Sequence, residues 1–156
     1  SNPPCLMISV TRRGDGTKKD TLLNIEQTRE FVVNIVSQAM AGAMNQCSAD
    51  YPHGVDEMSQ VGLTPLPSVR VKPLRVVESP VHLECELHSQ LEIGDGKVGS
   101  SVVIIGRIVQ VHVREDAYDQ GRIKIEALQP ISRLAGASYA TLGNIFELTR
   151  PSHPQA

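Results

Sequence analysis

The chain has 156 residues, of which 40% are hydrophobic and 21% are charged, and its formal net charge is −2. This length and balance predict a single globular domain over residues 1–156 and exclude wholesale disorder. Acidic and basic residues nearly cancel, and the only aromatic side chains are three Tyr and two Phe. We therefore expect neither a nucleic-acid partner nor a membrane-surface partner.

The three cysteines, Cys5, Cys47 and Cys85, are widely spaced and form no CxxC pair. They are expected to be free thiols rather than a disulfide framework or metal ligands. No apolar run is long enough to cross a membrane, and the first residues do not resemble a signal peptide. The expectation is a cytoplasmic protein without a metal site.

The first half of the chain predicts short strands and short helices. Residues 5–10 are apolar and predict a buried strand, and Asp20 is a plausible N-cap for a short helix with Leu22, Leu23 and Ile25 on its apolar side. Residues 30–36 are rich in β-branched side chains and predict a strand, followed by a helix over 37–45 that Ser37 caps. Residues 46–68 predict a long loop with one helical turn.

Two long strands dominate the second half. Residues 81–93 alternate, with His82, Glu84, Glu86 and His88 on the face that we expect to be solvated. Residues 100–113 predict a partner strand, in which Gly106 indicates a bulge or bend. After a polar loop, residues 145–151 predict a last short strand and 152–156 a loose tail. The whole pattern predicts a mainly β protein, a β-barrel with a few short helices.

Two further motifs favour structural roles. "GDGKVG", residues 94–99, matches a dinucleotide pattern, but a strand rather than a helix follows it, so a hairpin loop is the better interpretation. His82 and His88 could in principle bind a metal from one strand face, although no third ligand cluster accompanies them. The sequence contains no GxSxG and no HExxH motif.

The stretch "TKKDT", residues 17–21, lies where a loop becomes a helix. Free backbone N–H groups and the positive end of the helix dipole point outward at such a position. With Lys18, Lys19 and a threonine hydroxyl beside them, they suit a phosphate monoester. The alternative is a lysine-rich surface turn before a capped helix, and sequence physics alone leaves both open.

Several segments, in this order, carry a family resemblance. They are "NPPCLMISVTRR", "KKDTLLNIEQTREFVVNIV", "AMNQCSADYPHGVDEMSQVGLTPLPS", "VKPLRVVESPVHLECEL", "VVIIGRIVQVHV" and "LQPISRLAGASYA". Together they resemble the flavin reductase-like family of FMN-binding split barrels, of the flavoredoxin type. The resemblance extends from about Asn2 to Pro151, and the chain apparently lacks the first strands of that family.

The resemblance implies a homodimer with FMN near the subunit interface. Lys19, Asp20 and Thr21 match the segment at the flavin phosphate, and Lys18 adds positive charge there. Thr11 and Arg12 match the end of a strand that runs beside the cofactor, and Tyr139 matches a segment near the flavin. The loop over residues 48–54 would flank the face where nicotinamide or another substrate docks.

The activity implied is that of an NAD(P)H-dependent flavin oxidoreductase, in which FMN takes hydride from NADH or NADPH and passes electrons to free flavin or another small-molecule acceptor. No acid or base residue is then required of the protein, because the flavin carries the chemistry. The alternatives are a non-enzymatic FMN electron carrier, a barrel that has lost flavin binding and acts as an interaction module, or a site for another cofactor such as haem.

Overall fold

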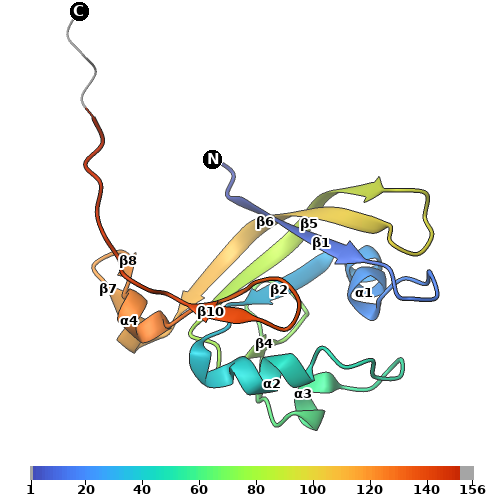
Figure 1. Cartoon of the computed structure of the whole chain (residues 1–156), viewed down its shortest axis with the longest axis horizontal. Helices are drawn as coiled ribbons and strands as arrows, with labels where there is room; N and C mark the ends of the chain where they lie inside the picture. The colour runs from blue at the N-terminus through green and yellow to red at the C-terminus, as the bar shows by residue number, and fades with distance from the viewer. Residues whose placement is uncertain (1, 152–156) are drawn as a thin grey trace, which may run out of the picture.

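A computed structural model describes residues 2–151, and its centre is an antiparallel sheet in the strand order β1-β6-β5-β2 (Figure 1). These strands are β1 (Cys5–Thr11), β2 (Glu30–Asn34), β5 (Val81–Ile93) and β6 (Ser101–Val113). The helix α1 (Asp20–Thr28) lies beside the sheet. The predicted mainly β fold is confirmed, and the predicted tail over residues 152–156 lies outside the described residues.

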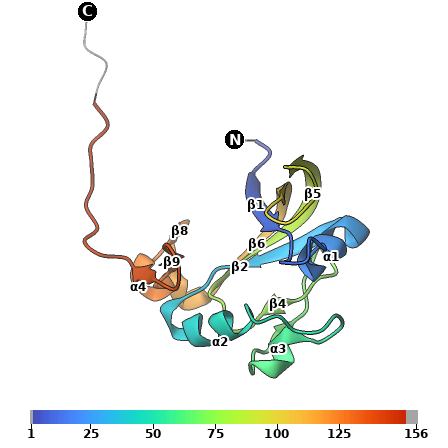
Figure 2. The same cartoon turned by 45° about the vertical axis from the view of Figure 1, so that its right-hand side comes forward.

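Smaller elements surround the sheet, and Figure 2 shows α2 and α3 gathered on one side of it and α4 toward the end away from α1. In chain order they are η1 (Gln38–Met40), α2 (Ala41–Gln46), α3 (Glu57–Gln60), β3 (Pro65–Leu66), β4 (Arg75–Val76), η2 (Glu115–Ala117), β7 (Tyr118–Asp119), β8 (Arg122–Ile123), α4 (Ile125–Leu128), β9 (Ile131–Arg133) and β10 (Tyr139–Thr141). The single turn α3 confirms the helical turn predicted in the long loop.

The hydrophobic core lies between α1 and the inner face of the sheet. Leu22 and Ile25, one turn apart on α1, are almost completely buried, whereas Leu23 points outward. They pack with residues of all four strands, namely Val10, Phe31, Cys85, Leu87, Val102 and Ile104. Burial of this apolar face, rather than helix propensity, holds the nine-residue α1 in place.

The long hairpin β5–β6 confirms the structural interpretation of "GDGKVG". Its strands pair antiparallel, and Gly94, Gly96 and Gly99 in the connection have positive φ angles. The predicted irregularity at Gly106 is also present, because the register shifts between Leu87 and Ser89 on the opposing strand. A Cβ on Gly106 would lie 2.8 Å from Cε1 of Phe31, so this aromatic ring requires glycine there.

Several local predictions are wrong. β1 is an edge strand in which only Val10 is buried, because its other face has no element over it among the described residues. Lys19, not Asp20, is the N-cap of α1, and Asp20 is the first helical residue. The helix predicted over 37–45 is a short 3₁₀ turn followed by α2, and the side chain of Ser37 makes no cap hydrogen bond.

The end of the described chain also differs from the prediction. Residues 145–151 form no strand, and Ile145, Phe146 and Leu148 are largely exposed. The last strand is β10, which pairs with β9. Helix α4 was missed because its four residues are too few to show a helical period.

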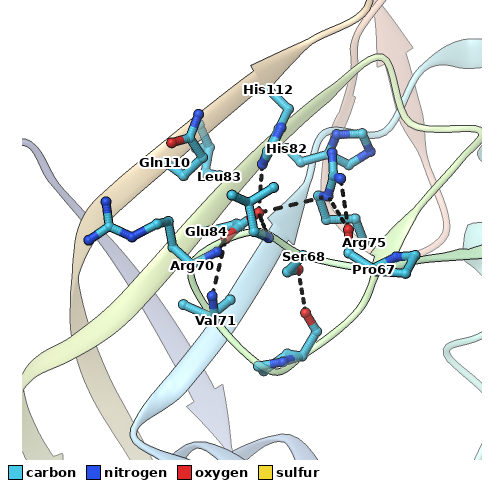
Figure 3. Close-up of polar contacts among 12 residues, drawn as sticks. Pro67, Ser68, Arg70, Val71, Arg75, His82, Leu83, Glu84, Gln110 and His112 are labelled. Carbon is cyan, nitrogen blue, oxygen red and sulfur yellow. Dashed lines mark hydrogen bonds and ion pairs between the residues drawn. The ribbon is translucent and has the colours of Figure 1, made fainter.

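The outer face of β5 is not solvated as predicted. His82 is 6% exposed and Glu84 is 0% exposed. The loop over residues 67–74 covers Glu84 (Figure 3), and Nε2 of His82 lies 2.7 Å from the carbonyl of Val76 on β4. Alternation locates the two faces of a strand but does not reveal whether a distant loop covers one of them. The expectation of a solvated face fails for these two residues and holds for His88, which is exposed.

Candidate functional site

The loop before α1 closes on itself and presents the start of the helix. The N–H of Gly16 donates to the carbonyl of Arg13, and the N–H of Arg13 donates to the carbonyl of Thr17, each over 2.9 Å. Asp15 accepts from both the N–H and the hydroxyl of Thr17, and these two hydrogen bonds lower the pKa of Asp15. The segment is therefore an ordered turn rather than a loose one.

Lys18 and Asp20, two of the residues expected at a phosphate, already have partners. Nζ of Lys18 lies 2.7 Å from Glu26 on α1. The carboxylate of Asp20 lies 2.9 Å from Arg13 and 2.7 Å from Nδ1 of His53. The hydrogen bond with His53 and the charge of Arg13 lower the pKa of Asp20, so this carboxylate is ionised and its charge is compensated.

Lys19 and Thr21 remain open at the start of α1. Both are exposed, and among the described residues neither side chain has an ion-pair or hydrogen-bond partner. The N–H groups of Leu22 and Leu23 donate to the carbonyl of Lys19, whereas those of Asp20 and Thr21 precede any intrahelical acceptor. One ammonium, one hydroxyl and two N–H groups thus gather at the positive end of a helix dipole, which suits an anion.

Arg12 supports this turn from the strand side. The guanidinium of Arg12 contacts Glu92 near the end of β5 and donates to the carbonyl of Gly16 over 3.4 Å. Its side chain is only 12% exposed, and its Nε is buried without a partner among the described residues. Arg12 therefore braces the loop from within. Thr11 is exposed at the end of β1, opposite Ser101.

A mostly apolar groove of about 530 Å³ begins beside Thr21 and follows α1. Below, "the α1 groove" means the hollow lined by Ile8, Thr21, Asn24, Ile25, Thr28, Glu30, Phe31, Val32, Val33, Lys72, Pro73 and Leu74. Its volume is within the usual range for small-molecule sites, and its few polar groups lie on α1 and around Glu30 and Lys72. Its mostly apolar lining suits the ring system of a ligand whose separate anionic group lies at the start of α1.

A second hollow of about 380 Å³ lies on the other side of Thr21 and is acidic. His53, Asp56 and Glu57 line it together with Asp20. Burial, followed by the charges of Asp20 and Asp56, raises the pKa of Glu57. The charge of Lys19 partly opposes this rise, and the carboxylates of the hollow disfavour an anion among them.

Tyr139 lies in a different place from the other expected site residues. It lines a hollow of about 450 Å³ with α2 and β9, and this hollow has no residue in common with the α1 groove. Figures 1 and 2 both show α1 well apart from the β9–β10 hairpin. The structure thus brings Thr11, Arg12, Lys18, Lys19, Asp20 and Thr21 into one region and leaves Tyr139 outside it.

Sequence reasoning missed His53 and Lys72. His53 contacts Asp20 from 33 positions away, and Lys72 lines the α1 groove from the loop that covers Glu84. The only signal for His53 was its place in the loop expected to flank a docked substrate. That loop does reach the start of α1, through His53.

The family model described as "Flavin reductase like domain" matches residues 1–129. The chain belongs to the flavin reductase-like family. An uncharacterised protein of Halalkalibacterium halodurans is 40% identical over 157 residues, which cover 99% of this chain and 75% of the relative. The family-model match confirms the resemblance derived from the quoted segments.

Solved structures confirm the split-barrel fold. The structure of nitrilotriacetate monooxygenase component B from Bacillus cereus is 39% identical, with a TM-score of 0.89 over 94% of this chain and 73% of that one. A split-barrel protein of Shewanella frigidimarina shares the fold at 24% identity, with a TM-score of 0.82 over 96% and 72%. Flavoredoxin of Desulfovibrio vulgaris (Miyazaki F) is 25% identical, with a TM-score of 0.75 over 93% and 73%.

The described residues 2–151 contain no helix that is both long and apolar enough to cross a membrane. They also contain no cluster of three or more His, Cys, Asp or Glu side chains that could hold a metal ion.

Proposed function

We propose that the chain binds FMN and, as an NAD(P)H-dependent oxidoreductase, uses it to pass electrons from NADH or NADPH to free flavin or another small-molecule acceptor. The observation that carries this proposal is that Lys19 and Thr21 are open at the start of α1 and that Thr21 lines the α1 groove, in a flavin reductase-like chain. A ring and a phosphate, the two ends of FMN, match these two features.

In this proposal Lys19 neutralises the phosphate, while the hydroxyl of Thr21 and the free N–H groups donate hydrogen bonds to it. Lys18 holds α1 in place through Glu26, and Asp20 holds the loop of His53. The bound flavin supplies the hydride- and electron-accepting chemistry. None of these side chains has to transfer a proton, so we expect them to set flavin affinity rather than turnover.

The proposal extends to a homodimer in the cytoplasm with the flavin near the subunit interface. The proposal also includes Thr11 and Tyr139 as neighbours of the flavin. Thr11 lies at the end of β1, next to Arg12, and Tyr139 lies on the separate β9–β10 hairpin. Sedimentation of the protein with and without FMN tests the dimer. A monomer at micromolar concentration in both cases would contradict this part.

The test of flavin binding is a fluorescence titration of FMN and of riboflavin, which lacks the phosphate. A double Lys19→Ala, Thr21→Ala variant should lose at least about tenfold in FMN affinity, because each hydrogen bond to a charged group contributes about 1.5–3 kcal/mol when buried and less when exposed. Its riboflavin affinity should fall much less, because Lys19 does not line the groove and Thr21 is only one of its lining residues. Lys97→Ala, which removes an exposed lysine of the hairpin, is the matched control.

An assay of flavin reduction distinguishes an enzyme from the alternative functions. The FMN-loaded protein should lose its visible flavin absorbance rapidly under anaerobic NADH or NADPH and recover it when free flavin is added. A stable oxidised spectrum in both reductants would favour a non-enzymatic electron carrier. A parent protein that binds neither FMN nor riboflavin would overturn the proposal.

A further inference from the structure

The most deeply buried charge of the described residues is the carboxylate of Glu84 on β5, which is 0% exposed. Its Oε1 accepts from the N–H of Val69 over 2.9 Å and lies 2.6 Å from Nε2 of His112. Its Oε2 accepts from the N–H of Arg70 over 2.6 Å and from that of Val71 over 3.2 Å (Figure 3). A carboxylate is tolerated in such a place only when its oxygens are paired in this way.

Three of these four partners are consecutive backbone N–H groups of the loop over residues 67–74. The guanidinium of Arg75 lies 3.8 Å from Glu84 and donates to the carbonyl of Pro67, so it closes the base of the loop. The N–H of Lys72 donates to Glu30 over 2.8 Å. Apart from Val71, the loop buries little apolar surface, and it is therefore held mainly by polar contacts to carboxylates.

The same loop forms one wall of the α1 groove. Lys72, Pro73 and Leu74 line the groove opposite α1, directly after the residues that Glu84 holds. His112, on β6, approaches Glu84 from the opposite side to the loop and fixes the carboxylate in place. The position of the groove wall is thus linked to a side chain that does not line the groove.

We propose that Glu84 is a positioning residue, which, with His112, fixes the loop over residues 67–74 as the wall of the ligand groove. Three parallel N–H contacts define one backbone position, whereas an apolar side chain in place of Glu84 would fill the space without orienting the loop. The consequence for ligand binding rests on the proposed flavin function. The consequence for the loop does not.

Hydrogen–deuterium exchange of the full chain tests the loop directly. In a Glu84→Gln variant the peptide that contains residues 67–74 should take up about one to three more deuterons at short times, because at least the N–H of Val69 loses its acceptor and the loop is held less firmly. Glu86→Gln is the matched control, because Glu86 is on the same strand but pairs with Arg107 in solvent. His112→Gln should act in the same direction with a smaller effect, and it replaces Glu84→Gln if that variant does not fold.

Flavin titrations then test the groove wall. Release of the loop should weaken FMN and riboflavin binding by the same factor, about tenfold, because the loop walls the groove proposed for the ring. Loss of Lys19 and Thr21 should instead weaken FMN binding much more than riboflavin binding. An unchanged exchange rate at Val69, Arg70 and Val71 in a folded Glu84→Gln variant would overturn the proposal. So would a released loop with parental affinity for both flavins. If the parent binds no flavin, the proposed function fails and hydrogen exchange alone decides the role of Glu84.

Discussion

Replacing Glu84 by glutamine keeps the size of the side chain and removes its charge, and we expect this change to lower the free energy of unfolding. The amide group has one oxygen where the carboxylate has two. If its nitrogen takes the place of Oε2, the N–H groups of Arg70 and Val71 face a donor. If it takes the place of Oε1, only the N–H of Val69 does, because His112 can exchange tautomers and accept.

The second orientation of the amide costs less free energy, and it therefore sets the expected decrease in the free energy of unfolding. It leaves one buried backbone donor unpaired, which costs about 1–3 kcal/mol. The control Glu86→Gln removes an exposed ion pair with Arg107 and should cost at most about 1 kcal/mol. Urea denaturation of the parent and of both variants at pH 7 measures these differences.

The pH dependence of the free energy of unfolding tests whether the missing charge of Glu84 causes this loss of stability. Burial alone would raise the pKa of Glu84, but the N–H groups of Val69 and Arg70 and the bond with His112 lower it below its ordinary value of 4.5. The ionised carboxylate therefore stabilises the fold above that pH, and this contribution disappears as the pH falls through the folded-state pKa. The difference in the free energy of unfolding between the parent and Glu84→Gln should therefore decrease at acidic pH. A cost below about 0.5 kcal/mol at pH 7, or a gap that persists unchanged at pH 3, would refute this reasoning.

Three further predictions concern the core and the buried side chains. Gly106→Ala should lower the free energy of unfolding by about 1–3 kcal/mol through overpacking against Phe31, as urea denaturation can measure. Burial raises the pKa of Cys85 to about 11, so a thiol reagent at pH 8 should label exposed Cys5 but not Cys85 in the folded protein, which peptide mass spectrometry would show. Burial lowers the pKa of His82 below its ordinary 6.5, so the stability of the parent should decrease as the pH falls below about 6.5, and His82→Gln should flatten the dependence of the urea midpoint on pH between 7 and 5.

The elements that the sequence predicted well are those with a local cause. The strand β5 follows from its alternating pattern and β6 from its run of β-branched residues, and their hairpin follows from the glycines of "GDGKVG". The inward face of α1 follows from the spacing of Leu22 and Ile25. The strand predicted over residues 145–151 was wrong because a strand also needs a non-local partner. These residues have none among the described residues.

The candidate site was predicted in part. The segment over residues 18–21 does begin a helix beside a groove, but the sequence could not divide its members into open and paired groups. Lys18 pairs with Glu26 and Asp20 pairs with His53, contacts that depend on how the helix and a distant loop are placed. Because these contacts occupy Lys18 and Asp20, Lys19 and Thr21 are the side chains of this segment that remain open.

The sequence by itself indicated the mainly β class, the family and the place of the proposed anion site, since each rests on patterns within short segments of the chain. The tertiary structure alone decided that Glu84 is buried, that His112 and the loop over residues 67–74 hold it, and that this loop walls the α1 groove. The physical reason is that burial and hydrogen bonding of an alternating polar residue depend on what packs over the strand. The three N–H groups of the loop that pair with Glu84 lie 13 to 15 positions from it, and His112 lies 28 positions away.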